Sequence, residues 1–192
     1  EGAYLNPSNL GSIERRYELF TSFSSMLDGA QYSNVGLAIN RNTSKKHLVD
    51  GLGFSYTRLG VGDLEARDRS GQKGGSFSSQ NSSFGLSGSM QLSSRLRMGL
   101  TGKIIQGEIA GYKSNRSLAV DAGMTYQVKA FNRNGTFGAT LMNLGQKTGY
   151  INDKDPLPAT MSVGYSMGFG MVNAMGGLSR GIYDQKTALS LG

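Results

Sequence analysis

The amino-acid sequence predicts an all-β protein, and more specifically an antiparallel transmembrane β-barrel. Three observations lead to this fold class: apolar and polar side chains that alternate along successive segments, the absence of a long apolar helix, and connections that are alternately short and long. The alternation is clearest over residues 83–129, where three strands are predicted in a row. Because a strand places successive side chains on opposite faces, each segment would present one apolar face and one polar or glycine face.

Apolar side chains recur at every second position in residues 83–92, 96–104 and 118–129. Serine, glycine, threonine and charged residues fill the positions between them. Each segment has about the 9–11 residues that cross a bilayer as a tilted strand. The side chains that we predict to face lipid are Leu96, Met98, Leu100, Leu118, Val120, Met124, Val163 and Tyr165. Those that we predict to face the interior are Arg97, Thr101, Lys103, Asp121 and Thr125.

The chain before these segments divides into a short N-terminal part and three further strands. Residues 1–16 are predicted to form a plug or periplasmic segment, because Asn6-Pro7 is a turn signal and proline is excluded from central strands. Residues 17–192 would then form the barrel. Its first strands are predicted at residues 17–26, 32–40 and 49–58, and the polar, glycine-rich and serine-rich residues 59–82 are predicted to form a long loop.

The alternation continues toward the C-terminus and gives about ten strands in all. The later strands are predicted at residues 137–141, 161–169 and 172–178, and from residue 187 onward. The connections are short at residues 93–94, 130–134 and 169–170, and long at residues 59–82, 106–117 and 145–158. Outer-membrane barrels have short periplasmic turns and long extracellular loops. The alternation of connection lengths therefore predicts that the three long loops share the extracellular side.

Composition and charge exclude several classes of protein. No apolar run reaches the roughly 18 residues that a membrane helix needs. The 192 residues include 29 glycines and no cysteine, which excludes a disulfide framework and thiolate metal sites. The net charge is +7, but the cations are scattered over turns and form no nucleic-acid-binding patch. We expect them to be solvated at a barrel rim or to contact anionic lipid headgroups.

Four short motifs follow one another along the chain: Leu5-Asn6-Pro7-Ser8-Asn9-Leu10-Gly11, Gly60-Val61-Gly62-Asp63-Leu64-Glu65, Met142-Asn143-Leu144-Gly145 and Asp155-Pro156-Leu157-Pro158-Ala159-Thr160. The first resembles the Asn-Pro-Ala-Gly-Leu segment of FadL-superfamily outer-membrane barrels, with Ser8 and Asn9 in place of Ala-Gly. The others resemble the PorV/PorQ branch of that superfamily. The resemblance implies the bacterial outer membrane and a barrel of about fourteen strands. Since the chain opens with no signal peptide, we expect a fragment that lacks its signal sequence and its last strands.

Two functions from different classes follow from the resemblance. A PorV-like barrel implies a scaffold or shuttle in protein secretion or surface assembly, of the type IX kind, with a protein partner at its extracellular loops. The wider FadL resemblance implies a transporter, in which a hydrophobic small molecule leaves the lumen past a plug containing Asn6 and Pro7. The loop residues that we expect to bind a partner combine charges with apolar anchors. They are Asp63, Leu64, Glu65, Arg67, Phe77, Tyr112, Tyr150 and Ile151.

The alternative for the apolar loop residues is that they pack the loops over the barrel mouth. The sequence contains no arrangement of residues that identifies an enzyme, a cofactor site or a metal site. His47 lies beside lysines in a turn. Asp63, Glu65 and Asp68 lack the spacing of a calcium-binding loop, and the arginines among them predict an ion-paired loop instead.

Three charged side chains are predicted to lie in the lumen: Arg97, Lys103 and Asp121. If strand pairing places Thr101 opposite Asp121, Lys103 lies diagonally beside that carboxylate on the same face of the sheet. Diagonal neighbours are within reach of a long side chain. We therefore predict a stabilising pair between Lys103 and Asp121.

Overall fold

The computed structural model describes residues 5–26, 29–41, 48–130, 133–150, 153–170 and 172–192. Within these residues the protein is almost entirely β, with a short 3-10 helix, η1 (Pro7–Ser12), near its N-terminus. The strand pairs in this part of the chain are all antiparallel. The prediction of an all-β, antiparallel protein is therefore confirmed.

One large sheet holds eleven of the described strands, in the order β1-β2-β3-β4-β5-β7-β8-β11-β12-β13, with β6 paired to β5 outside this path. The ten strands of the path agree with the number predicted. They are β1 (Tyr17–Ser25), β2 (Ala30–Asn40), β3 (Gly51–Arg67), β4 (Lys73–Gln91), β5 (Leu96–Ile109), β7 (Ser117–Ala130), β8 (Arg133–Gly145), β11 (Thr160–Phe169), β12 (Val172–Gly181) and β13 (Thr187–Leu191). The shorter strands are β6 (Tyr112–Lys113), β9 (Thr148–Tyr150) and β10 (Asp153–Asp155), and the last two form a separate two-stranded sheet.

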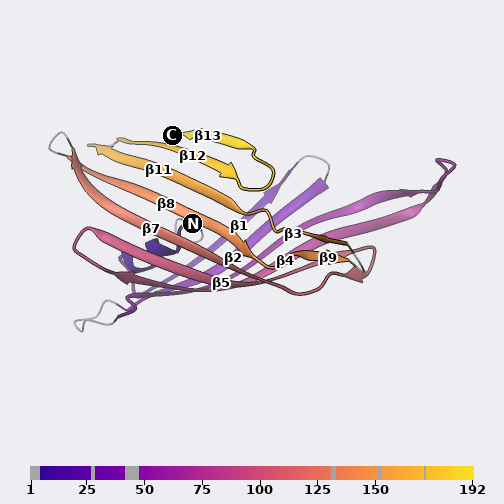
Figure 1. The fold of residues 1–192 in the computed structure, drawn as a ribbon, viewed down its shortest axis with the longest axis horizontal. Coiled ribbons are helices and arrows are strands. Elements are labelled where there is room, and N and C mark those ends of the chain that lie inside the picture. Colours follow the sequence, from indigo (N-terminus) through magenta and orange to yellow (C-terminus); the bar gives the residue numbers. More distant parts are fainter. Residues whose placement is uncertain (1–4, 27–28, 42–47, 131–132, 151–152, 171) are drawn as a thin grey trace.

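The large sheet is strongly curved, and Figure 1 shows its first strands crossing the direction of its last ones. In the part of the chain that the structure describes, β1 pairs only with β2 and β13 pairs only with β12. The pairing therefore leaves two free edges and does not close the sheet into a ring. None of the described helical segments is long and apolar enough to cross a membrane.

The two faces of the sheet differ in the way that the alternation predicts. Strand register aligns side chains in rows that run from strand to strand. On one face, which we call the outer face, such a row contains Val35, Tyr56, Phe84, Ile104 and Leu118. On the opposite, inner face, a row contains Ala38, Gly53, Ser87, Thr101 and Asp121. Large apolar groups thus gather on one side of the sheet, and small or polar groups on the other.

Burial follows the same division. Leu100 on the outer face is 57% exposed, whereas the next residue, Thr101 on the inner face, is 7% exposed. Six of the side chains predicted to face lipid are exposed large hydrophobic groups of the outer face, namely Met98, Leu100, Leu118, Val120, Val163 and Tyr165. Leu96 and Met124 are half-buried. The predicted register of these strands is correct.

The prediction of a long loop over residues 59–82 is wrong. β3 and β4 remain paired up to Arg67 and Lys73, and the chain turns only between these two residues. The turn is closed by bonds from the Asp68 N–H to the Gln72 carbonyl (3.0 Å) and from the Gly71 N–H to the Asp68 carbonyl (3.0 Å). Both faces of this two-stranded ribbon are largely open to solvent, so no one-sided apolar pattern marks it. We call residues 62–78 the arm; in Figure 1 it extends well beyond the rest of the sheet.

The loops predicted at residues 106–117 and 145–158 also contain more regular structure than expected. β5 continues to Ile109, and a two-residue turn at Ala110 (φ 50°) and Gly111 (φ 82°) leads into β6. Positive φ at both central residues is the geometry of a tight hairpin. Residues 145–158 include the β9–β10 hairpin. Each segment is short and polar, which is why alternation alone does not reveal it.

Candidate functional site

η1 lies against the inner face of the sheet, on strands β2, β3, β4, β5 and β7 (Figure 1). This close approach depends on glycines. A Cβ atom at Gly99 would overlap the backbone of Pro7 and Ser8, and one at Gly123 would overlap the Asn6 amide. Gly51 and Gly53 meet the segment in the same way at Leu10 and Gly11. The glycine-rich inner face is therefore a docking surface for the chain's own N-terminal segment.

Asn6 and Ser8 attach this segment to β7. The Asn6 side chain caps η1 by accepting the Ser8 N–H (3.1 Å), and its Nδ2 donates to the Met124 carbonyl (3.1 Å). The Ser8 hydroxyl lies 3.3 Å from that of Thr125. Asn6 and Pro7, predicted as a plug motif, are thus both buried at the contact between η1 and the sheet.

Arg97 closes the same contact at the start of β5. Its Nε lies 3.2 Å from Asp50 Oδ2, without the alignment of a hydrogen bond, while Asp50 Oδ1 accepts the Ser89 hydroxyl (2.6 Å). The guanidinium also donates to the Ser12 hydroxyl and, at 3.1 Å, to Gln91 Oε1. Arg97 faces inward as predicted. Sequence reasoning missed Asp50, because nothing in a single acidic residue before a strand indicates its partner.

Lys103 and Asp121 form the second charged cluster of the inner face. Thr101 pairs with Asp121 as predicted, and Lys103 Nζ lies 2.8 Å from Asp121 Oδ1. The two side chains are 10% and 5% exposed. The predicted contact between them is therefore present in a nearly buried setting.

Asn143 completes this cluster and was not predicted. β8 carries an irregularity opposite Asp121, where Asn143 adopts a left-handed conformation (φ 58°) and its N–H donates to Asp121 Oδ1 (2.7 Å). The Asn143 Oδ1 accepts from Lys103, and its Nδ2 donates to the Pro158 carbonyl (3.1 Å). Asparagine tolerates this backbone conformation better than most residues. The Met142-Asn143-Leu144-Gly145 motif was the only signal that could have pointed to it.

The connections at residues 106–117 and 145–158 fold onto each other. The Asn115 side chain accepts the Gly149 N–H (2.8 Å), and the Ser117 hydroxyl donates to the Lys147 carbonyl (3.2 Å). The hydroxyl end of Tyr150 lies against Gly107, which faces inward from β5. These loops therefore cover the inner face at the end opposite to η1. Tyr150 is half-buried there, whereas Tyr112 on the adjoining turn is 68% exposed.

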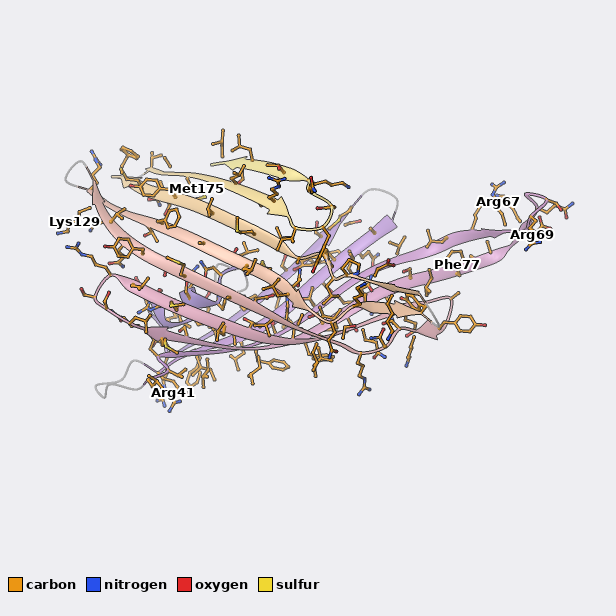
Figure 2. All side chains as sticks on the ribbon, in the orientation of Figure 1. Arg41, Arg67, Arg69, Phe77, Lys129 and Met175 are labelled. Atoms are coloured by element: carbon orange, nitrogen blue, oxygen red, sulfur yellow. The ribbon has the colours of Figure 1, made fainter. Side chains whose placement is uncertain are left out.

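The arm carries the remaining loop residues that were predicted to bind a partner. Leu64 pairs with Phe77 across the two strands. Glu65 forms ion pairs with Arg67 (2.8 Å) and with Lys73. The ion pairing expected here is therefore present, but it lies on paired strands and not in a loop. Figure 2 shows Arg67 and Arg69 at the tip of the arm and Phe77 farther down it. The structure thus separates the predicted partner-binding residues into the arm and the loops that fold over the sheet.

Two of the predicted residues, and one histidine, fall where the structure gives no side-chain description. Ile151 and His47 lie outside the described residues, and so does the side chain of Asp63. Among the side chains that are described, no three or more His, Cys, Asp or Glu residues gather in a way that could hold a metal ion.

The described residues form cavities on both faces of the sheet. The larger of two such cavities, about 780 Å³, is lined by β1, β2, β3 and β4 and includes Phe23, Arg58 and Gln80. The smaller, about 400 Å³, lies on the inner face and includes Leu5 beside η1 and Met175 on β12. No family model, no curated protein and no solved structure matches this chain.

Proposed function

We propose that this sheet is part of the wall of a transmembrane β-barrel in the bacterial outer membrane, and that its arm binds a protein partner. The observation that carries the membrane part is the outer face. Large apolar side chains are exposed on it from one edge strand to the other. They include Leu19, Leu37, Phe54, Leu86, Leu100, Val120, Phe137, Val163, Leu178 and Leu189. Soluble monomers rarely expose apolar patches beyond a few hundred Å², whereas a lipid-facing wall must do so.

A membrane setting makes one demand on the free edges of β1 and β13. In hydrocarbon, each unpaired backbone N–H or C=O group costs several kcal/mol, so lipid-exposed open sheet edges do not occur. The proposal therefore requires that both edges be paired in the inserted protein. Cysteines introduced on β1 and on β13 would test one way of meeting this requirement. If the two strands lie side by side in membranes, the cysteines should form a cross-link.

Because the inner face is covered, the structure favours a scaffold rather than an open pore. η1 covers the inner face at one end, the β9–β10 hairpin covers it at the other, and the Lys103–Asp121–Asn143 cluster is nearly buried between them. The arm, in contrast, projects from the sheet with mixed charges and the Leu64–Phe77 pair. A surface with an apolar centre and a charged or polar rim is typical of protein–protein interfaces. A PorV-like role in protein secretion or surface assembly fits these features.

A second candidate is transport of a hydrophobic small molecule, as in FadL-type barrels. The inner-face cavity of about 400 Å³ favours transport, because two apolar side chains line it. Leu5 precedes η1, and Met175 lies on β12. Both side chains are exposed. Figure 2 shows Met175 at the end of the sheet away from the arm, so the two candidate functions use different regions.

Shortening the arm separates the two candidates. Val61 and Ser79 are paired across β3 and β4, so residues 62–78 can be replaced by Asn-Gly, which makes a tight hairpin turn. A matched control, Met175→Ser, alters the inner-face cavity and leaves the arm intact. Both variants are expressed with the wild type, extracted in mild detergent and examined for copurifying protein, and gel mobility with and without boiling reports whether the barrel folds.

We expect the shortened variant to fold and lose its partner, and Met175→Ser to keep it. If the partner stays bound to the shortened variant while Met175→Ser changes uptake of a hydrophobic solute, the transporter is the correct function.

A further inference from the structure

The larger cavity lies on the outer face, directly beyond the apolar rows. Side chains at every second position of a strand share a face, and on β3 the series Phe54, Tyr56, Arg58 passes from the apolar surface into the cavity. Tyr56 packs against Phe84 with ring centroids 4.7 Å apart, and this pair marks the end of the apolar surface. Phe23 of β1, 70% exposed, forms part of the cavity wall. The cavity therefore lies next to the apolar surface, and its lining combines Phe23 and Val61 with polar side chains and glycines.

Among the described residues that line this cavity, Arg58 carries the one charged side chain. Its Nη2 donates to Gln80 Oε1 (2.7 Å), and Gln80 Nε2 in turn donates to Glu108 Oε2 (3.3 Å) on the next strand. This chain of bonds orients the guanidinium while it uses only one of its five N–H donors. Gln31, Ser33, Ser78 and Ser79 supply further neutral polar groups. A planar cation with free donors and hydroxyl neighbours is suited to a phosphate group.

We propose that this cavity binds the phosphate-bearing headgroup of a lipid in the surrounding leaflet, with its acyl chains along the Tyr56–Phe84 surface. The inference rests on the proposed membrane setting, because only there does the apolar outer face adjoin lipid. It commits to a lipid rather than a free anion for two reasons: the cavity has a volume of about 780 Å³, and it is continuous with that apolar face.

The probe is diphosphoryl lipid A, compared with its dephosphorylated form, added to the full chain in a zwitterionic detergent. Retained lipid is measured by native mass spectrometry. Arg58→Gln removes the cation but keeps a side chain that can bond to Gln80. Gly62→Leu fills the cavity from its lining, since a Cβ at Gly62 meets nothing within 4 Å and Gly62 has no positive φ. Arg69→Gln, at the tip of the arm and outside the cavity lining, is the matched control.

We expect the wild type and Arg69→Gln to retain the phosphorylated lipid equally, and Arg58→Gln to bind it about tenfold more weakly, as befits a lost charge-assisted hydrogen bond. Gly62→Leu should weaken binding of both lipid forms. Retention of phosphorylated lipid by Arg58→Gln at the wild-type level overturns the inference. So does displacement of the lipid by inorganic phosphate at equal concentration, because the site would then be specific for a free anion.

Insertion into phosphatidylcholine vesicles is measured on the same samples to separate the two proposals. A wild type that fails to insert overturns the membrane function itself. A wild type that inserts but does not distinguish the two forms of lipid A overturns only the headgroup site.

Discussion

Two carboxylates in this protein each form an ion pair with a lysine, one in a nearly buried setting and the other in an exposed one. Asp121 binds Lys103 on the inner face, where both side chains are nine-tenths or more buried, and Asn143 contacts both of them. Glu65 binds Lys73 and Arg67 on the arm, where all three side chains are about half exposed or more. The same chemistry therefore serves two purposes. Water screens the arm pair and leaves it adaptable, whereas burial makes each member of the inner cluster depend on the others.

Removing Asp121 should have the largest effect of any single change. Asp121→Ala leaves Lys103 buried without its counter-charge and the Asn143 N–H without its acceptor. Breaking a buried pair in this way costs about 3–5 kcal/mol. Denaturant unfolding in detergent, followed by circular dichroism, measures the loss of unfolding free energy. We expect a smaller relative effect on the uptake of any solute.

The matched control is the double variant Lys103→Met/Asp121→Leu, which removes both charges together. Replacing a whole buried pair by apolar groups is often close to neutral, so this variant should recover much of the lost stability. A double variant as unstable as Asp121→Ala would mean that the pair itself is not the cause.

Lys103 lies on the inner face of β5, and a charge placed on the outer face of β5 tests whether burial by lipid differs from burial by protein. Leu100→Arg places an unpaired cation on the outer face, one residue from Thr101. In a bilayer it should cost about 2–4 kcal/mol, measured by unfolding from vesicles. An equal stability of Leu100→Arg and wild type in vesicles contradicts a lipid-facing outer surface.

Asn143 allows the backbone and side-chain parts of the inner cluster to be separated. Asn143→Ala loses the contacts with Lys103 and Pro158 and must hold a left-handed conformation, so about 1–3 kcal/mol should be lost. Asn143→Gly loses the contacts but adopts positive φ freely. If the glycine variant is no more stable than the alanine variant, backbone strain contributes nothing here.

The exposed pair should give the smallest effect. Glu65→Gln on the arm should lower stability by about 0.2–1 kcal/mol, and by less at high salt, because solvent screens the pair. Thermal unfolding at two ionic strengths measures this. A cost like that of Asp121→Ala would erase the contrast between the two clusters.

Alternation predicted the sheet wherever one face is apolar and the other is not. That is why the strands around Leu100 and Val120, and the Lys103–Asp121 contact, could be placed from spacing alone. The arm escaped prediction because a solvent-exposed ribbon has no one-sided pattern, so Glu65 and Phe77 appeared to lie in a loop. Asp50 and Asn143 escaped because their partners are set by tertiary contacts, and a single polar residue carries no record of a partner far along the chain.

The anchoring of η1 also fixes an order of events during folding. Asn6 and Ser8 reach residues 118 and 117 positions away, at Met124 and Thr125. Contacts at such separation form late, because the intervening chain must first be organised at an entropic cost. The η1 segment, which precedes β5 and β7 in the chain, can therefore reach its final position only after β5 and β7 have paired. Until then Gly99 and Gly123 remain uncovered, and a protein caught at that stage would expose a bare glycine surface to chaperones and proteases.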